Sequence, residues 1–181
     1  MRIAFYKPNS KATGSAFSAS VTENSLWLRM IKQSNWNDQT KRGSFRENSE
    51  IEDKNIVGKF NPIEASGMID AMNRNVEYSF VHTGKQKVVT INGAIKPYVN
   101  KEGVQVGYSF SLFKNKIPFL IGFTFPEAQA LKIFLTKYVE DSFSVVETEE
   151  GAPKKPYKKE AAPVKELPQE EETSEGQEVE F

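Results

Sequence analysis

Residues 117–143 read IPFLIGFTFPEAQALKIFLTKYVEDSF, a strand pattern that changes directly into a helix pattern. Alternation of large apolar residues at the start of this stretch predicts one buried strand face, made of Phe119, Ile121, Phe123 and Phe125. Thr124 and Glu127 have the spacing of a helix capping box, and Pro126 is tolerated in a first helical turn. The stretch therefore predicts a buried strand that leads without a loop into a helix.

The predicted helix is amphipathic. Its apolar side recurs every three or four residues and consists of Ala128, Leu131, Phe134, Leu135 and Tyr138. Polar side chains occupy the other side, namely Glu127, Lys132, Thr136, Glu140 and Asp141. We expect a helix with this pattern to lie with one side on a sheet.

A weaker copy of the same pattern lies 64 residues earlier. Residues 55–60 form a strand pattern, and Pro62 then opens a helical pattern whose apolar positions are Ala65, Met68, Ile69 and Met72. At this offset Gly58 matches Gly122 and Pro62 matches Pro126. We therefore predict an α+β fold of two tandem units, at about residues 1–75 and 76–146. Each unit is a curved antiparallel sheet followed by one helix.

Further strands are predicted from alternation and from turn residues. In the first unit they are residues 1–7, 15–22 and 26–33, and in the second they are residues 76–82, 85–91, 94–99 and 104–113. Asn92-Gly93 is the strongest hairpin signal in the chain. Residues 34–53 are predicted to be a long loop, partly strand, and loops of this length are often functional.

Charge divides the chain into a basic body and an acidic tail. Residues 1–146 contain 19 Lys and Arg against 13 Asp and Glu, whereas residues 147–181 contain 5 Lys against 11 Glu. We predict a nucleic-acid-binding domain over residues 1–146 and a disordered tail over 147–181, because low hydrophobicity and high charge cannot offset the entropy of ordering. The tail either makes the protein soluble, occupies a basic groove, or recruits a partner through Glu178, Glu180 and Phe181.

Composition argues against most enzyme classes. The chain has no Cys and one His, His82, so thiolate sites and His-based metal sites are not expected, and His82 is most simply a strand-end residue. There is no nucleotide-binding glycine motif. We predict no catalytic residues, no metal and no cofactor. An open alternative is a nuclease with a divalent cation bound by carboxylates from Glu47, Glu50, Glu52 and Asp53.

The cellular location is predicted by exclusion. No apolar run approaches the roughly 18–20 residues of a membrane span, and the first ten residues, MRIAFYKPNS, lack the apolar core of a signal peptide. We therefore expect a cytoplasmic protein, in the host cytoplasm if the source is viral.

Cations and aromatic residues alternate with apolar residues on the predicted strands. In residues 26–33, Leu26, Leu28 and Met30 face inward, which leaves Trp27 and Arg29 together on the outer face. Single-stranded nucleic acid requires cations for its phosphates and flat rings for its bases. The candidate binding residues are Trp27, Arg29, Lys85 and Lys87, followed by Trp36, Lys96 and Lys114. The alternative is that the rings belong to the core and the lysines to an ordinary surface.

Residues 121–131, IGFTFPEAQAL, resemble the strand-to-helix signature of the transcription-coactivator family positive cofactor four. Residues 84–91, GKQKVVTI, look like the basic strands of that family. The order of elements, with two strand-rich units each closed by a helix, is similar to the Whirly proteins, although their Lys-Gly-Lys-Ala-Ala-Leu run is absent. Both resemblances imply an oligomer that binds single-stranded DNA across curved antiparallel sheets.

The acidic tail ending in Phe181 resembles the tails of bacterial and bacteriophage single-stranded-DNA-binding proteins, which recruit replication partners. We therefore predict a non-enzymatic protein, viral in origin, that binds single-stranded DNA without sequence preference in replication, recombination or repair. One alternative is a transcription or RNA-binding regulator. Another is a structural or assembly protein whose aromatic sheet face is a subunit interface.

Overall fold

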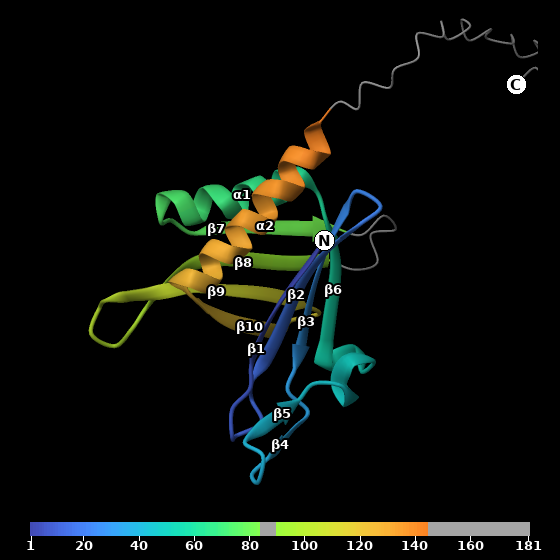
Figure 1. Ribbon diagram of the computed structural model, residues 1–181, viewed down its shortest axis with the longest axis vertical. Coiled ribbons are helices and arrows are strands. Elements are labelled where there is room, and N and C mark those ends of the chain that lie inside the picture. Colours follow the sequence, from blue (N-terminus) through green and yellow to red (C-terminus); the bar gives the residue numbers. More distant parts are fainter. Residues whose placement is uncertain (84–89, 145–181) are drawn as a thin grey trace, which may run out of the picture. The chain divides into compact units, whose positions relative to one another are not determined.

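Two four-stranded antiparallel sheets, each followed by a helix, make up the fold (Figure 1). The structure is a computed structural model that describes residues 1–83 and 90–144. This arrangement confirms the predicted α+β fold with two tandem units. The predicted disorder of the tail, and its boundary near residue 147, lie outside the described residues.

The first sheet has the strand order β1-β2-β3-β6. Its strands are β1 (Arg2–Lys7), β2 (Ser15–Thr22), β3 (Ser25–Lys32) and β6 (Asn55–Phe60), and helix α1 (Pro62–Arg74) follows. Asn61 caps α1, because its side chain accepts a hydrogen bond from the Glu64 N–H while the Glu64 carboxylate accepts one from the Asn61 N–H. Strand β6 is thus an edge strand that leads directly into a helix.

The second sheet has the order β10-β9-β8-β7. Its strands are β7 (Tyr78–Thr83), β8 (Thr90–Val99), β9 (Gln105–Lys114) and β10 (Ile117–Thr124), and helix α2 (Phe125–Phe143) follows. Asn115 and Lys116 both have positive φ angles, of 51° and 66°, which is the backbone that a two-residue hairpin turn requires. The edge strand again leads directly into the helix, as in the first unit.

The junction of β10 and α2 matches the sequence pattern with one correction. Thr124 is the N-cap, and its N–H and hydroxyl both donate to Glu127, at 2.8 and 2.9 Å. Burial would raise the pKa of Glu127, but hydrogen bonds from Lys7 and Thr124 outweigh it and hold the pKa below its ordinary value. Phe125 was predicted to lie on the strand face. It is instead the first helical residue and 48% exposed, because the cap at Thr124 ends the strand.

Residues 34–53, predicted as a loop, contain short elements. Strands β4 (Asn35–Asn37) and β5 (Arg42–Ser44) form a small hairpin, and two 3-10 turns follow, η1 (Glu47–Ser49) and η2 (Glu52–Lys54). Figure 1 shows this excursion at one end of the first sheet, between β3 and β6.

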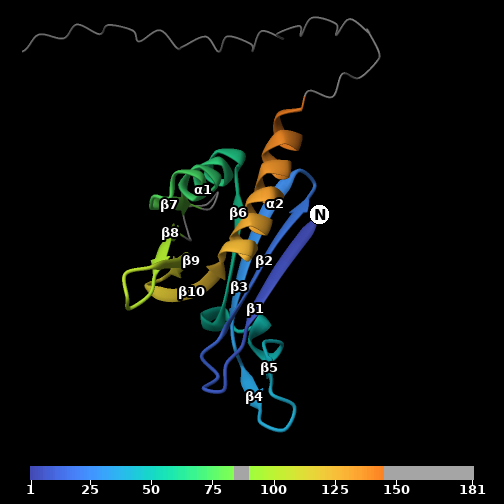
Figure 2. The ribbon, with the colours of Figure 1, turned by 60° about the vertical axis from the view of Figure 1, so that its left-hand side comes forward.

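One core joins the two sheets and the two helices. Phe17 of β2 meets Phe110 of β9 and Phe123 of β10 edge to face, with ring centroids 5.5 and 5.4 Å apart. The strands of the second sheet run across those of the first, and α1 and α2 lie next to each other (Figures 1 and 2). The inner faces of both sheets are therefore buried, and their outer faces point away from this core. No helix in the described part of the chain is long and apolar enough to cross a membrane.

Candidate nucleic-acid interface

The outer face of the first sheet is set by the register of its four strands. One cross-strand row consists of Arg2, Ser20, Trp27 and Lys59. The next row consists of Ala4, Ser18, Arg29 and Val57, and the third of Tyr6, Ala16, Ile31 and Asn55. The residues between them, such as Leu28 and Met30, are buried in the core. The prediction that Trp27 and Arg29 share the outer face is confirmed.

This face is basic and carries exposed rings. The four strands contain no Asp or Glu, and the cations in their outward rows are Arg2, Arg29 and Lys59. The other two strand cations lie on the opposite side, where Lys7 pairs with Glu127 and Lys32 lies over the Phe119 ring. Trp27 is 39% exposed and Tyr6 is 59% exposed. The strands of the second sheet also lack Asp and Glu. Neither sheet therefore places a carboxylate on a strand where a polyanion would approach.

A groove of about 770 Å³ lies beside edge strand β6. Trp27 and Lys59 of the first sheet line it together with His82 and Lys114 of the second. The groove thus combines an aromatic ring, two lysines and a histidine from both units. It brings together two of the residues predicted from sequence, Trp27 and Lys114.

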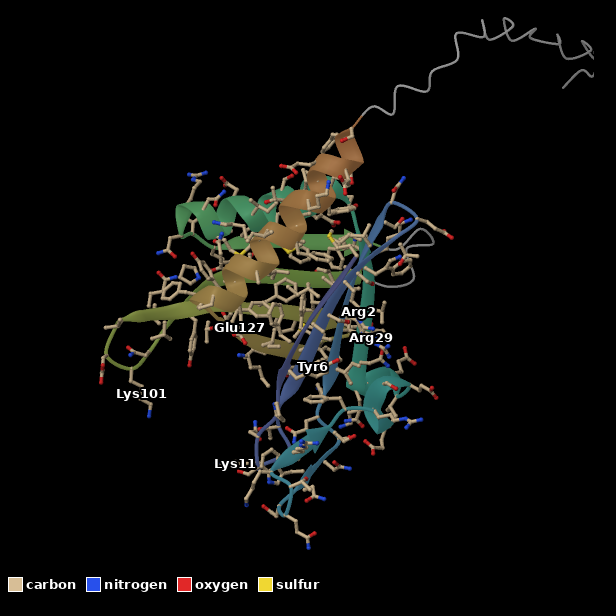
Figure 3. The ribbon with its side chains drawn as sticks, viewed as in Figure 1. Arg2, Tyr6, Lys11, Arg29, Lys101 and Glu127 are labelled. Atoms are coloured by element: carbon tan, nitrogen blue, oxygen red, sulfur yellow. The ribbon has the colours of Figure 1, made fainter. Side chains whose placement is uncertain are left out.

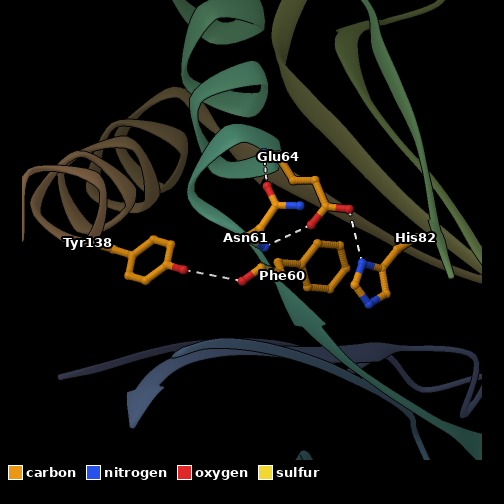
Figure 4. Close-up of polar contacts among 5 residues, drawn as sticks. All are labelled: Phe60, Asn61, Glu64, His82 and Tyr138. Carbon is orange, nitrogen blue, oxygen red and sulfur yellow. Dashed lines mark hydrogen bonds and ion pairs between the residues drawn. The ribbon is translucent and has the colours of Figure 1, made fainter. Parts of the chain in front are cut away.

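The wall of the groove next to α1 is a hydrogen-bonded cluster (Figure 4). His82 Nδ1 lies 3.0 Å from a carboxylate oxygen of Glu64, and the His82 ring stacks on Phe60 with centroids 5.3 Å apart. The Tyr138 hydroxyl donates to the Phe60 carbonyl at 3.2 Å. Because Glu64 also caps α1, the cluster fixes His82 relative to the helix. His82 is indeed a strand residue, and these contacts give it a structural role.

Lys114 is paired across the two units. Its Nζ lies 3.0 Å from the Glu52 carboxylate, and its side chain is only 20% exposed whereas that of Glu52 is 75% exposed. Glu52 belongs to η2, immediately before β6. An anion that reaches Lys114 must therefore compete with an exposed carboxylate for the same cation.

Arg29 is held in place by the excursion after β3. Its Nη2 donates to the carbonyl oxygen of Ser49 at 2.5 Å, while its Nε is buried without a hydrogen-bond partner. Arg29 thus lies on the outer face, as alternation predicts, and its guanidinium is in addition fixed in direction by the Ser49 carbonyl.

Two other predicted residues lie away from the groove. Trp36 is on the β4–β5 hairpin, where its indole N–H donates to Asp38 at 3.1 Å. Lys96 is exposed on the outer face of the second sheet, opposite Ser109. The remaining predicted residues lie outside the described residues, namely Lys85, Lys87, Glu178, Glu180 and Phe181.

The acidic residues of the excursion have partners of their own. Glu47 accepts hydrogen bonds from the hydroxyls of Ser34 and Ser44, and the Ser34 bond is the main reason that its pKa is lowered. Glu52 pairs with Lys114. Within residues 1–83 and 90–144, no three His, Asp or Glu side chains gather in a way that could hold a metal ion.

Sequence reasoning missed Arg2, Tyr6 and Lys59. The alternation of residues 55–60 could have identified Lys59. The even-numbered residues of this strand are buried and the odd-numbered ones, which include Lys59, are more exposed. Arg2 and Tyr6 alternate with Ile3 and Phe5 in the same way. What alternation could not give was the register, which places Lys59 directly opposite Trp27, Arg2 in the same cross-strand row, and Tyr6 two rows away.

Comparison with known proteins finds a likeness in structure and none in sequence. No protein-family model matches the chain, and a search of curated proteins gives no match. The fold is similar to that of MRP1/MRP2 from Trypanosoma bruciei, with a TM-score of 0.53 and 11% identity over 77% of this chain and 84% of that chain. The fold is Whirly-like.

Two plant structures give the same result. The plant transcriptional regulator PBF-2 has a TM-score of 0.53 and 12% identity, over 77% of this chain and 80% of that chain. WHY1 from Arabidopsis thaliana has a TM-score of 0.53 and 14% identity, over 77% and 88%. The Whirly-like order of elements predicted from the sequence is thus confirmed at the level of the fold.

Proposed function

We propose that this chain is a non-enzymatic protein that binds single-stranded nucleic acid across the outer face of the first sheet and into the groove beside β6. The observation that carries the proposal is the cross-strand row containing Arg2, Trp27 and Lys59, on strands that lack any carboxylate. The cations of this row attract phosphates. Stacking of a base on an exposed indole contributes about 1–3 kcal/mol to the free energy of binding.

The same geometry favours binding with little sequence preference. Stacking tolerates every base, and lysine and arginine contacts to phosphates carry no sequence information. The Whirly-like fold agrees with the single-stranded ligand that the resemblance in the sequence implies. From the sequence we extend the proposal to single-stranded DNA in replication, recombination or repair, for a viral protein in the cytoplasm of its host.

The roles of the tail are part of the proposal and rest on sequence alone. An acidic segment that contains Glu178 and Glu180 complements a basic sheet face, and it ends in Phe181, which a partner protein could bind. Removing residues 147–181 is expected to strengthen binding if the tail competes for the groove. If the affinity for nucleic acid is the same without residues 147–181, the tail does not compete for the groove, and its role is to recruit a partner or to keep the protein soluble.

The test is a titration of labelled oligo-dT, followed by fluorescence anisotropy at several salt concentrations. Trp27→Ala should weaken binding about 5- to 150-fold, because one stacked base is lost. Trp36→Ala is the matched control, since Trp36 lies on the separate β4–β5 hairpin and should change affinity little. Equal effects of the two substitutions, or salt-insensitive binding, would contradict this placement of the strand.

A regulator that binds RNA or acts in transcription is a second candidate, because one structural neighbour is a transcriptional regulator. Oligonucleotides of one sequence made as DNA and as RNA separate the two. A protein that reads the 2′-hydroxyl binds the RNA more tightly, whereas contacts to phosphates and ring faces alone give similar affinities.

An assembly protein is a third candidate, supported by the second sheet. Its outer face exposes Val81, Leu120 and Phe113, which are 66%, 59% and 39% exposed. An apolar face of this kind is suited to contact another protein. This function predicts oligomers that resist salt, together with no affinity for nucleic acid, and sedimentation with and without oligo-dT tests both.

A further inference from the structure

A small pocket lies on the outer face of the first sheet, separate from the groove. Its volume is about 50 Å³, and its polar lining comes from Arg2, Tyr6, Ser18 and Arg29. These residues belong to three strands, β1, β2 and β3, which the register places side by side. Arg2, Tyr6 and Arg29 are labelled on the strands of the first sheet in Figure 3.

The positive charge of this pocket has no counter-charge. Neither Arg2 nor Arg29 forms an ion pair with a carboxylate in the described part of the chain. Arg29 Nε is the one buried side-chain nitrogen or oxygen among the described residues that lacks a hydrogen-bond partner. A buried donor without an acceptor is costly, and it often indicates the place of a bound water or ion.

The chemistry of the lining selects an oxyanion. Two guanidinium groups, a phenol and a hydroxyl supply only hydrogen-bond donors and positive charge toward a tetrahedral anion, and the guanidinium fork fits phosphate oxygens in pairs. Arg29 is already fixed by its bond to the Ser49 carbonyl, so that little side-chain entropy is lost when an anion binds.

The size of the pocket limits what enters it. Its 50 Å³ compares with 770 Å³ for the groove, so it admits a phosphoryl group and excludes a nucleoside. A terminal phosphomonoester carries about −1.5 to −2 charges at pH 7, which suits two guanidinium groups better than the single charge of a phosphodiester.

We propose that this pocket binds a phosphoryl group of the nucleic acid, and that a terminal phosphate binds it best. The inference rests on the proposed function, because it places one end of a bound strand on the same sheet face as Trp27 and Lys59.

The experiment uses the full chain and three unlabelled oligo-dT strands of one length, with a 5′-phosphate, a 3′-phosphate or no terminal phosphate. Each competes against one internally labelled strand, so that no dye occupies an end. We expect one of the phosphorylated strands to bind about tenfold more tightly than the unphosphorylated strand, as one charge-assisted contact would give. Arg2→Gln should abolish this preference.

Arg42→Gln is the matched control, because Arg42 is an exposed arginine of the β4–β5 hairpin that has no ion pair among the described residues. It removes the same charge and should retain the preference. A second variant, Arg29→Lys, keeps the charge but loses the fork, and it should also lose the preference. Thermal unfolding of each variant shows whether the fold is kept.

Three other results would each decide the matter. Equal affinities for all three strands, with Arg2→Gln equal to Arg42→Gln, would overturn the inference and leave the proposed function in place. Equal affinities with a salt slope reduced by about 0.7 in Arg2→Gln alone would also overturn the inference, because the proposed function already predicts that loss from the cross-strand row that contains Arg2. Absence of any binding by the wild-type chain would overturn the proposed function and the inference together.

Discussion

Gly93 explains why the strongest turn signal in the sequence lies inside a strand. Asn92-Gly93 was predicted to be a hairpin turn, and this prediction is wrong, because β8 continues from Thr90 to Val99. A Cβ on Gly93 would lie 2.2 Å from the Phe80 ring and 2.9 Å from Leu112. The glycine is thus required by side-chain packing between strands, which the dipeptide alone cannot reveal.

Gly93→Ala should therefore destabilise the protein by about 1–3 kcal/mol, because Phe80 must move to make room. The measurement is urea unfolding. Gly122→Ala is the control, since a Cβ there meets nothing within 4 Å. We expect it to be neutral or slightly stabilising. Similar losses in both variants would mean that strand propensity, and not the contact with Phe80, decides the effect.

At the scale of elements, both strand-to-helix junctions could be predicted because their signals are local. Alternation, a capping residue and a proline lie within a few residues of each other, at Asn61 and Thr124. The groove could not be predicted in this way. It requires β6 to pair with β3 across the excursion of residues 33–54, and it requires Lys114 of the second unit to reach the first.

The ion pair between η2 and β9 predicts a variant that binds more tightly than the wild type. Glu52→Gln releases Lys114, so the affinity for oligo-dT should rise and the salt slope should steepen by about 0.7, as for one added phosphate contact. Glu50→Gln removes the same charge from a neighbouring exposed residue that has no ion pair among the described residues. Salt-dependent anisotropy titrations of both variants are the measurement.

An equal gain in both variants would show that only the net charge matters. A gain in Glu52→Gln that persists after Lys114→Gln is added would also contradict the competition, because the lysine would then have no part in it. Thermal unfolding controls for the contribution of the ion pair to the contact between the two units.

At the scale of the whole molecule, the two units depend on each other. Phe17 of the first sheet packs between Phe110 and Phe123 of the second, and it is 2% exposed. Alternation over the predicted strand at residues 15–22 is enough to put Phe17, Ala19 and Val21 on one face. It could not show that the inward faces of two sheets meet, because contacts between residues so far apart in the chain leave no local pattern.

Phe17→Ala should cost about 3–5 kcal/mol and loosen both sheets at once. Phe113→Ala is the control, because Phe113 is 39% exposed on an outer face and should cost far less. Hydrogen exchange read strand by strand is the measurement, since a shared core predicts faster exchange in β8 and β9 as well as in β2. Faster exchange in the first sheet alone would mean that the units unfold independently.

The core shared by the two units also bears on how a chain of this kind could arise. A polypeptide with only one unit would leave the partners of Phe17 or of Phe123 uncovered, and a second copy of itself could cover them. Duplication and fusion of such a self-pairing ancestor would produce a repeat like this one.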